Sequence, residues 1–321
     1  MGIYRKIREA FLRLKSSDKP VTKSNATSSG HATEALIDFT CGRYSIRLPK
    51  SHLLPTYQRD HALYDRFLPI LAQHLPDDAL VIDVGANVGD TVAAMASRND
   101  RLHYVCIEPE ATFFNLLKMN TENMARTMPL RHPPILKQAF VGEAPIVGSL
   151  VSAGGTAKVQ ADSSANLTTT PYVTLSDVLT ECGNTGSSRH PILVKSDVDG
   201  WDFNVIRSLG KRIEDKNLLV FMECQTQTRQ QFESFMSFFG NYTDPDYTFT
   251  VFDNFGNILL EDATAKIVQS LLSYVWRQER GVGTRTIWYL DILISTTLTR
   301  PLARSAVHAY RQEYFQSSDL V

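Results

Sequence analysis

The sequence lacks three features that would each assign it to a definite class of protein. It has four cysteines in 321 residues, no apolar run long enough to predict a membrane-spanning helix, and a formal net charge of −1. The cysteines (Cys41, Cys106, Cys182 and Cys224) lie far apart, which favours reduced core residues over a disulfide framework or a metal site. The balanced charge gives no overall field to attract nucleic acid, and the length allows a full-sized core.

The N-terminus also lacks the apolar core and cleavage site of a secretory signal, so we expect a cytoplasmic protein. Residues 1–15 instead predict a basic amphipathic helix, which could lie on an anionic membrane surface or pack on its own domain or a partner. The polar residues after it predict a flexible linker. We therefore divide the chain into a helix plus linker at 1–33, an ordered domain at 34–300 and a C-terminal tail at 301–321.

Strands and helices alternate through the ordered domain. Compact apolar runs at 79–84, 104–108, 135–140, 192–197 and 218–223 are typical of buried parallel strands, and helical stretches lie between several of them. The chain then continues with a helix at 228–239, a strand, turn and strand at 247–261, a helix at 263–279 and a strand at 286–295. This pattern predicts an α/β fold with a mostly parallel sheet, helices on both faces and a C-terminal antiparallel strand.

A hairpin at 36–49 and a helix at 59–75, kinked at Pro69, are expected ahead of the first parallel strand. We expect this N-terminal part to form a cover over the substrate and cofactor. Residues 145–170, rich in Gly, Ser, Thr and Ala, predict a polar hairpin or loop beside the cleft that would influence acceptor specificity.

The first parallel strand leads into a glycine-rich turn with an unusual charge. Asp83, Gly85, Gly89 and Asp90 form the spacing D-x-G-x-x-x-G-D, with Asn87 between the glycines. The fingerprint G-x-G-x-x-G of a dinucleotide site is missing, and two carboxylates would repel a pyrophosphate. The acids favour a cationic nucleoside, which indicates S-adenosylmethionine.

Residues after the next two strands complete the predicted cofactor site. Glu108 ends the strand that follows the glycine turn, where a carboxylate accepts hydrogen bonds from ribose hydroxyls. Dehydrogenases share that acid, so it supports the assignment only together with the turn. Ala139 and Phe140 could present backbone amides and an apolar face to adenine.

Charged residues also end the fourth and fifth parallel strands. Lys195, Asp197 and Asp199 follow one apolar run, and Glu223 follows the next. Unpaired charges are rarely buried for stability, so we interpret Lys195 and Asp197 as functional. Asp199 could instead be a simple helix N-cap.

Three further residues are weaker candidates. Tyr57 could stack on or cap the methionine end of the cofactor, although such a tyrosine more often only packs. His52 could act as a base for the acceptor, although a lone loop histidine is usually solvated. Trp201 could line a sugar site or belong to the core.

These motifs together resemble a known family. The stretches "VIDVGANVGDT", "VCIEPE" and "ILVKSDVDGWDFNVIRSL", with Glu223 after the next strand, are similar to the FkbM family of S-adenosylmethionine-dependent methyltransferases. The family's fourth motif usually reads I-K-I-D-V-E-G-x-E; here Ser196 replaces Ile, Asp199 replaces Glu, and Asp202 replaces the last acid. The resemblance covers residues 80–225 and implies a class I, Rossmann-like methyltransferase domain with a seven-stranded sheet. It also implies an O-methyltransferase acting on sugars of surface polysaccharides, lipopolysaccharides or secondary metabolites.

The expected reaction is in-line transfer of the sulfonium methyl group to an acceptor hydroxyl. Asp197 or Asp199 would take the hydroxyl proton, and Lys195 would orient that acid or stabilise developing negative charge. Glu223 would contact the substrate, or hold a divalent cation together with Asp197, although two acids are too few to predict a metal site. The alternatives are a non-catalytic cofactor-fold subunit of a glycan-assembly complex and, with less support, an NAD-dependent oxidoreductase.

Overall fold

The computed structural model describes residues 34–143, 149–153, 156–160, 170–183, 190–278 and 286–315. The helix expected at residues 1–15 lies outside this part of the chain. Residues Ala35–Val321 form one contact-dense unit, which includes most of the segment that we set apart as a tail. In this segment the structure has a helix, α10 (Arg300–Tyr314), whose buried Ala306 and Tyr310 belong to the core.

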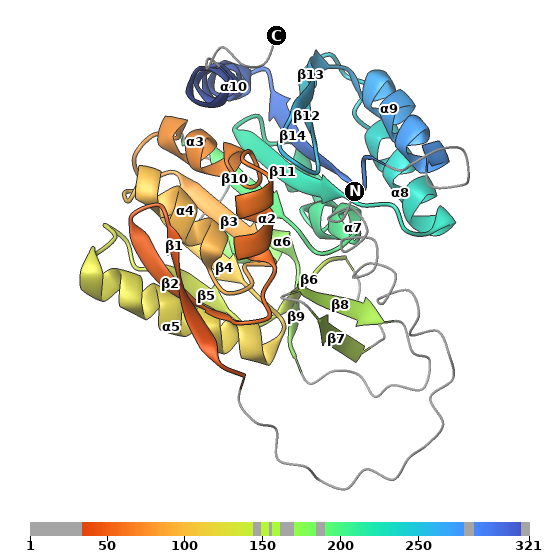
Figure 1. Ribbon diagram of the computed structural model, residues 1–321. Coiled ribbons are helices and arrows are strands. Elements are labelled where there is room, and N and C mark those ends of the chain that lie inside the picture. The colour runs from red at the N-terminus through yellow and green to blue at the C-terminus, as the bar shows by residue number, and fades with distance from the viewer. Residues whose placement is uncertain are drawn as a thin grey trace, which may run out of the picture. The chain divides into compact units, whose positions relative to one another are not determined.

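An eight-stranded sheet forms the centre of the domain (Figure 1). The order is β13 (Ile258–Ala263), β12 (Tyr247–Asp253), β14 (Leu290–Thr296), β11 (Leu218–Cys224), β10 (Ile192–Ser196), β3 (Leu80–Val84), β4 (His103–Ile107) and β5 (Ile135–Lys137). The five strands from β11 to β5 are parallel, whereas β14 is antiparallel to both β11 and β12, and β13 is antiparallel to β12. The sheet is mostly parallel with antiparallel strands on one side, as predicted. It has eight strands rather than the seven that the family resemblance implies, because β13, expected as the second strand of the pair at 247–261, joins it at the edge.

Helices cover both faces of this sheet, also as predicted (Figure 1). One face packs against α3 (Phe67–His74), α4 (Asp90–Arg98), α5 (Ala111–Thr127) and α10, and the other against α6 (Leu175–Glu181), α7 (Asp202–Arg207), α8 (Arg229–Gly240) and α9 (Ala265–Gln278). A 3₁₀ turn at Gly210–Glu214 follows α7. Because alternate residues of each central strand belong to two different core clusters, both faces of these strands are apolar, which explains their near-continuous hydrophobic runs.

The helix expected at 59–75 is wrong in its bounds and in its kink. The structure has two helices, α2 (Leu54–Asp60) and α3, separated by a turn in which Asp65 has a φ of 58°. Pro69 is the third residue of α3. A proline in the first turn removes no intrahelical hydrogen bond, so it starts a helix there rather than bending one.

Short strand pairs surround the main sheet. The predicted hairpin is confirmed as β1 (Leu36–Cys41) and β2 (Tyr44–Pro49), and β7 (Ser149–Ala153) pairs with β8 (Thr156–Gln160) inside the segment expected to be a polar hairpin. The run predicted as one strand at 135–140 is divided, because β5 ends at Lys137. The chain then forms β6 (Phe140–Val141), which pairs with β9 (Tyr172–Val173) in a separate small sheet.

Candidate active site

Strand pairing aligns charged residues on one face of the sheet. Asp83 on β3 pairs with Lys195 on β10, and Lys195 pairs with Phe221 on β11. Glu223 lies two residues beyond Phe221 and pairs with Asp291 on β14. Because paired residues on neighbouring strands point to the same face, these side chains line the face that packs against α3, α4 and α10.

A buried ion pair lies at the centre of this row. Lys195 Nζ is 2.9 Å from Asp83 Oδ1, and the two side chains are 5% and 0% exposed. Lys195 also donates a hydrogen bond of 3.1 Å to the carbonyl oxygen of Gly85. Burial lowers the pKa of Lys195, but the carboxylates of Asp83 and Asp197 outweigh burial and raise it. Lys195 is therefore a fixed cation rather than a proton donor.

The two glycines of the turn are required by close packing and by backbone conformation. Gly85 has a φ of 76°, and a Cβ atom at this position would lie 2.1 Å from the carbonyl oxygen of Asp197. Gly89 has a φ of 88° and is the N-cap residue of α4, whose first residue is Asp90. These positions bring the backbone of the turn against the end of β10 and place a helix N-terminus at the same edge of the sheet.

Glu108 is fixed at the end of β4 by two backbone amides. Its carboxylate accepts hydrogen bonds from the N–H groups of Asn87 (2.9 Å) and Glu110 (2.8 Å). Burial raises the pKa of Glu108 to about 7, although these two bonds oppose the shift. Each carboxylate oxygen retains a second lone pair for a ribose hydroxyl, so the arrangement fits a nucleoside.

Ser196 and Asp202, two departures from the family motif, contact each other. Ser196 Oγ donates a hydrogen bond of 2.6 Å to Asp202 Oδ1, and both residues are buried. The N–H groups of Val198 and Gly200 each donate to Asp202 at 3.2 Å. Asp202 therefore fixes the loop that carries Asp197 and Asp199, a role that the sequence analysis missed. The sequence signal for this contact was that two positions of the motif differ together: Ser196 places a hydroxyl where the family has Ile, and Asp202 places a shorter acid where the family has Glu.

Asp197 and Asp199, the two candidate bases, lie on this loop at the end of β10. The Asp197 side chain is 56% exposed, and its Oδ2 lies 3.9 Å from Lys195 Nζ. Asp199 has a φ of 54°. Its charge contributes to raising the pKa of both Tyr57 on α2 and Glu223 on β11. Asp197 is therefore exposed beside the buried pair, whereas Asp199 is half-buried and lies near Tyr57 and Glu223.

Three site residues were not among the sequence candidates, namely Asp291, Tyr64 and Tyr289. Asp291 lies opposite Glu223, and the hydroxyls of Tyr64 and Tyr289 are hydrogen-bonded to each other. Burial raises the pKa of Tyr289, and the charges of Asp291 and Glu223 contribute to the shift. No sequence pattern indicates these residues, because they come from the α2–α3 connection and from the start of a strand far along the chain.

The weaker sequence candidates differ in position. The ring centroid of Tyr57 lies 5.2 Å from that of Tyr64, and the charge of Asp199 contributes to raising the pKa of Tyr57 after burial. Tyr57 therefore lies beside the edge of the sheet that carries Asp197, Asp199 and Glu223, which we call the acid-lined edge. His52 instead lies two residues before α2, where its Nδ1 accepts a hydrogen bond of 3.2 Å from the N–H of Leu54. Trp201 precedes α7 and packs on Phe203, with ring centroids 6.0 Å apart, as expected for a partly buried core residue.

The expected adenine contacts lie where β5 gives way to β6. Ala139 is buried, at 4% exposure. The N–H of Phe140 donates a hydrogen bond of 2.8 Å to the carbonyl oxygen of Pro171, so this amide is already engaged. Phe140 would then contribute its ring rather than its N–H to a cofactor site.

One group of side chains in the described ranges has the composition of a metal site. The ligand atoms of Asp78, His103 and His132 all lie within 4.8 Å of one another. His103 is the first residue of β4, so this group lies at the opposite end of the strand from Glu108. His132 Nε2 is 2.8 Å from Asp78 Oδ1, and Arg131 is 3.5 Å from the same oxygen. The protein's own basic groups thus already surround this carboxylate.

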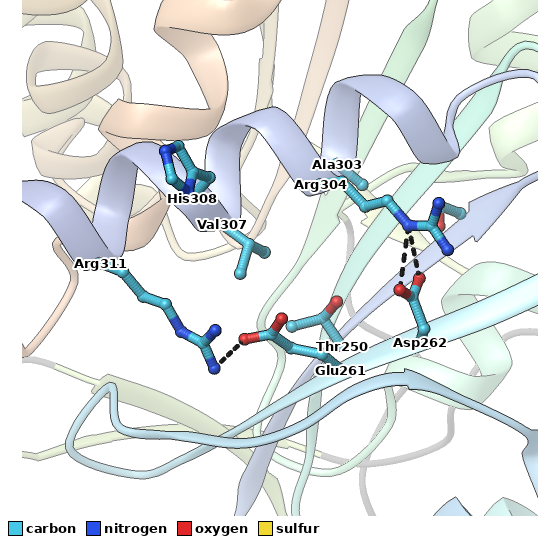
Figure 2. Close-up of a pocket in the computed structure, with 9 residues that line it drawn as sticks. Thr250, Glu261, Asp262, Ala303, Arg304, Val307, His308 and Arg311 are labelled. Carbon is cyan, nitrogen blue, oxygen red and sulfur yellow. Dashed lines mark hydrogen bonds and ion pairs between the residues drawn. The ribbon is translucent and has the colours of Figure 1, made fainter.

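A charged hollow lies between α10, β12 and β13 (Figure 2). Arg304 pairs with Asp262 at 2.9 Å, and Arg311 pairs with Glu261. Ser295 also lines this hollow and pairs with Leu219 near the start of β11, so the hollow lies away from the carboxyl ends of the parallel strands. It is distinct from the acid-lined edge.

Several solved methyltransferases are similar to this chain at low sequence identity. The O-methyltransferase from Bacillus cereus, in complex with SAH, is 11% identical with a TM-score of 0.39; the match covers 78% of this chain and 84% of that one. The plantazolicin methyltransferase BpumL, also with SAH, is 10% identical with a TM-score of 0.36, covering 75% and 88%. Precorrin-6y C5,15-methyltransferase from Geobacter metallireducens GS-15 is 10% identical with a TM-score of 0.35, covering 71% and 85%. No curated protein matches the chain significantly.

A family model decides the assignment. The methyltransferase FkbM domain matches residues 83–259, which is more than half of the chain. The match begins at Asp83 and includes the glycine turn, Glu108, the Lys195–Asp202 segment and Glu223. It supports the family resemblance and excludes the oxidoreductase alternative. The chain belongs to the FkbM methyltransferase family and is an S-adenosylmethionine-dependent enzyme.

Proposed function

We propose that the protein is an O-methyltransferase whose acceptor is a hydroxyl group, on a sugar of a surface glycan or a related metabolite. The observation that carries this proposal is the exposed carboxylate of Asp197 beside the buried Lys195–Asp83 pair. A carboxylate that is accessible and oriented by a fixed cation can accept a proton from a neutral nucleophile. A hydroxyl needs such a base, because it is a weak nucleophile while it keeps its proton.

The residues at the ends of β3 and β4 would hold the cofactor. Glu108 would accept hydrogen bonds from the ribose hydroxyls, and the turn from Gly85 to Gly89 would contact the methionine part. S-adenosylmethionine supplies an already activated methyl group when bound. The protein therefore needs to align the acceptor oxygen and exclude water rather than generate the electrophile.

Asp197 or Asp199 would remove the acceptor proton as the transfer occurs. The acceptor oxygen forms a bond to the methyl carbon while the carbon–sulfur bond breaks, and the electron pair of that bond stays on sulfur. The hydroxyl proton goes to the carboxylate, so charge and atoms balance. Lys195 would orient Asp197 through the 3.9 Å contact and stabilise negative charge on the oxygen. A positioned base of this kind contributes about 10²- to 10⁴-fold.

Methyl transfer from S-adenosylmethionine with a tritium-labelled methyl group tests the proposal. Nucleotide sugars, free oligosaccharides and lipid-linked glycans are the acceptors to compare, with product analysis to locate the label on oxygen. Asp197→Asn and Asp199→Asn should bind SAH normally, and at least one should lose most of its turnover. Unchanged turnover in both variants would refute the assignment of the base, and label on nitrogen or carbon would refute the reaction class.

We also propose a cytoplasmic location with peripheral membrane contact through residues 1–15. None of the helices in the described ranges combines the length and apolarity needed to cross a bilayer. The support for peripheral contact is the alternation of apolar and basic residues in 1–15. Co-sedimentation with anionic vesicles should decrease when residues 1–33 are deleted, and unchanged co-sedimentation would refute this contact.

A further inference from the structure

Glu223 and Asp291 form a carboxyl pair that the proposed chemistry does not use. They lie opposite each other on β11 and β14, and paired residues of antiparallel strands have Cβ atoms about 5 Å apart. Both point to the face of the sheet that carries Asp83 and Lys195. The pair is therefore part of the active-site edge, on the side away from Glu108 and the glycine turn.

The buried oxygen of Glu223 lacks a donor. Glu223 is 7% exposed, and among the described residues its Oε2 has no hydrogen-bond partner. A buried carboxylate oxygen without a donor is costly, because the protein does not replace the water that it has lost. A donor from outside the chain would remove this cost.

Charge around the pair is strongly negative. Four carboxylates lie close enough to Glu223 for their charges to raise its pKa, namely Asp197, Asp199, Asp202 and Asp291. Lys195, the cation that acts on Asp291, is already paired with Asp83 at 2.9 Å. Burial, reinforced by these carboxylates, raises the pKa of both Glu223 and Asp291 well above their usual range. Without a bound cation, the pair therefore favours its protonated form more than exposed carboxyl groups do.

We propose that the acceptor carries an ammonium group beside the hydroxyl that is methylated, and that Glu223 and Asp291 bind this ammonium group. The inference rests on the proposed O-methyltransferase function and specifies its acceptor as an amino-bearing polyol, such as an amino sugar. An ammonium group donates up to three hydrogen bonds, and its positive charge stabilises the ionised form of the pair. A phosphate or carboxylate in this position would be repelled by the same acids.

Aromatic side chains beside the pair suit the same ligand. Tyr64 and Tyr289 are hydrogen-bonded to each other, and Tyr57 lies close to Tyr64. The electrostatic environment of Tyr289 includes both Asp291 and Glu223. Tyrosine rings pack against the apolar faces of sugar rings and attract ammonium groups through their electron-rich faces. The carboxyl pair and the tyrosines would thus contact different parts of one acceptor.

Three oligosaccharides of matched size test the proposal, built from glucosamine, glucose and glucuronate. Calorimetry in the presence of SAH measures binding without methyl transfer, and labelled S-adenosylmethionine measures transfer separately. We expect the glucosamine probe to bind at least about tenfold more tightly than the glucose probe, and the glucuronate probe to bind most weakly. This order supports the proposal even if no probe is methylated, in which case only the proposed reaction fails.

Variants connect the preference to the pair. Glu223→Gln and Asp291→Asn should each reduce the glucosamine-to-glucose ratio towards one while SAH affinity and circular dichroism stay unchanged. Glu233→Gln, an exposed acid on α8 that pairs with Arg229, is the control and should leave the ratio unchanged. Equal binding of glucosamine and glucose probes, preference for glucuronate, no binding of any probe, or a preference that survives both variants would overturn the proposal.

Discussion

Two charged regions of this protein differ in how their carboxylates are compensated. In the hollow beside α10, Asp262 and Glu261 each meet an arginine from the helix (Figure 2). At the carboxyl end of β11 and the neighbouring amino end of β14, Glu223 and Asp291 face mainly other acids. The first arrangement is complete without a ligand and joins a helix to a sheet edge. In the second, no basic side chain of the described residues forms an ion pair with Glu223 or Asp291, as expected where a ligand supplies the cation.

The same contrast divides the active-site edge itself. Over β3 and β4 the acids have partners from the protein, since Asp83 meets Lys195 and Glu108 accepts two backbone hydrogen bonds. This half is organised before the cofactor arrives. Asp83 Oδ2 and Glu223 Oε2 are both buried without a hydrogen-bond donor among the described residues, but Asp83 is paired with Lys195, whereas Glu223 has no ion pair within that part of the chain. We infer that the enzyme prepares the cofactor site in advance and leaves the acceptor to complete the rest.

Removing Lys195, the cation paired with Asp83, should have the largest effect on stability. Lys195→Met leaves the carboxylate of Asp83 buried with no cation, and breaking a buried pair costs about 3–5 kcal/mol of unfolding free energy. Urea denaturation measures this loss. Arg304→Gln removes one partner of the exposed Arg304–Asp262 pair and should cost less than about 1 kcal/mol. Similar losses in the two variants would contradict the distinction between the two regions.

Loosening the loop that Asp202 holds should have the next largest effect. Asp202→Ala removes three hydrogen bonds, so the loop should no longer fix Asp197 and Asp199. We expect kcat to fall about 10²-fold, because small displacements of catalytic groups are costly. Asp202→Asn can keep the bonds from Ser196 and Val198 and should recover part of this loss. SAH affinity is the control, since a general loss of structure would reduce it as well.

The smallest predicted effect is a pH dependence of cofactor binding. Burial raises the pKa of Glu108 from 4.5 to about 7, so the protonated form is favoured in the free folded protein below about pH 7. The stability that this proton adds to the folded state is lost as the pH rises through 7. The cationic methyl donor favours the ionised form. Its affinity should therefore rise between about pH 6 and pH 8 by up to about tenfold. In Glu108→Gln this rise should be absent; an unchanged pH profile would show that another group is responsible.

Much of the fold was predictable because it depends on local patterns. The buried strands β3, β4, β10 and β11 read as apolar runs, and the glycine turn follows the first of them. The sequence pattern placed a kink at Pro69, because it does not distinguish a proline inside a helix from one in its first turn. The strand pair at 247–261 was predicted from the same kind of pattern, and only the count of seven strands, which came from the family resemblance, left out its edge strand β13.

The candidate site was predictable only where its residues follow a buried strand. Lys195, Asp197 and Glu223 stand out because charges after an apolar run are unusual. Asp291 and Tyr64 have no such context, and only strand pairing and the α2–α3 connection bring them to the site. Ser196 and Asp202 were visible in the sequence as two separate departures from the family motif. That they form a hydrogen bond could not be predicted, because it depends on the turn between them.

A crystal structure with SAH tests most directly whether the edge is divided into a prepared cofactor half and an acceptor half. We predict that both ribose hydroxyls lie on the carboxylate of Glu108, that the methionine part contacts the Gly85–Gly89 turn, and that Glu223 and Asp291 face the open acceptor side. A ribose bound away from Glu108, or a methionine ammonium group held by Glu223 and Asp291, would contradict this account.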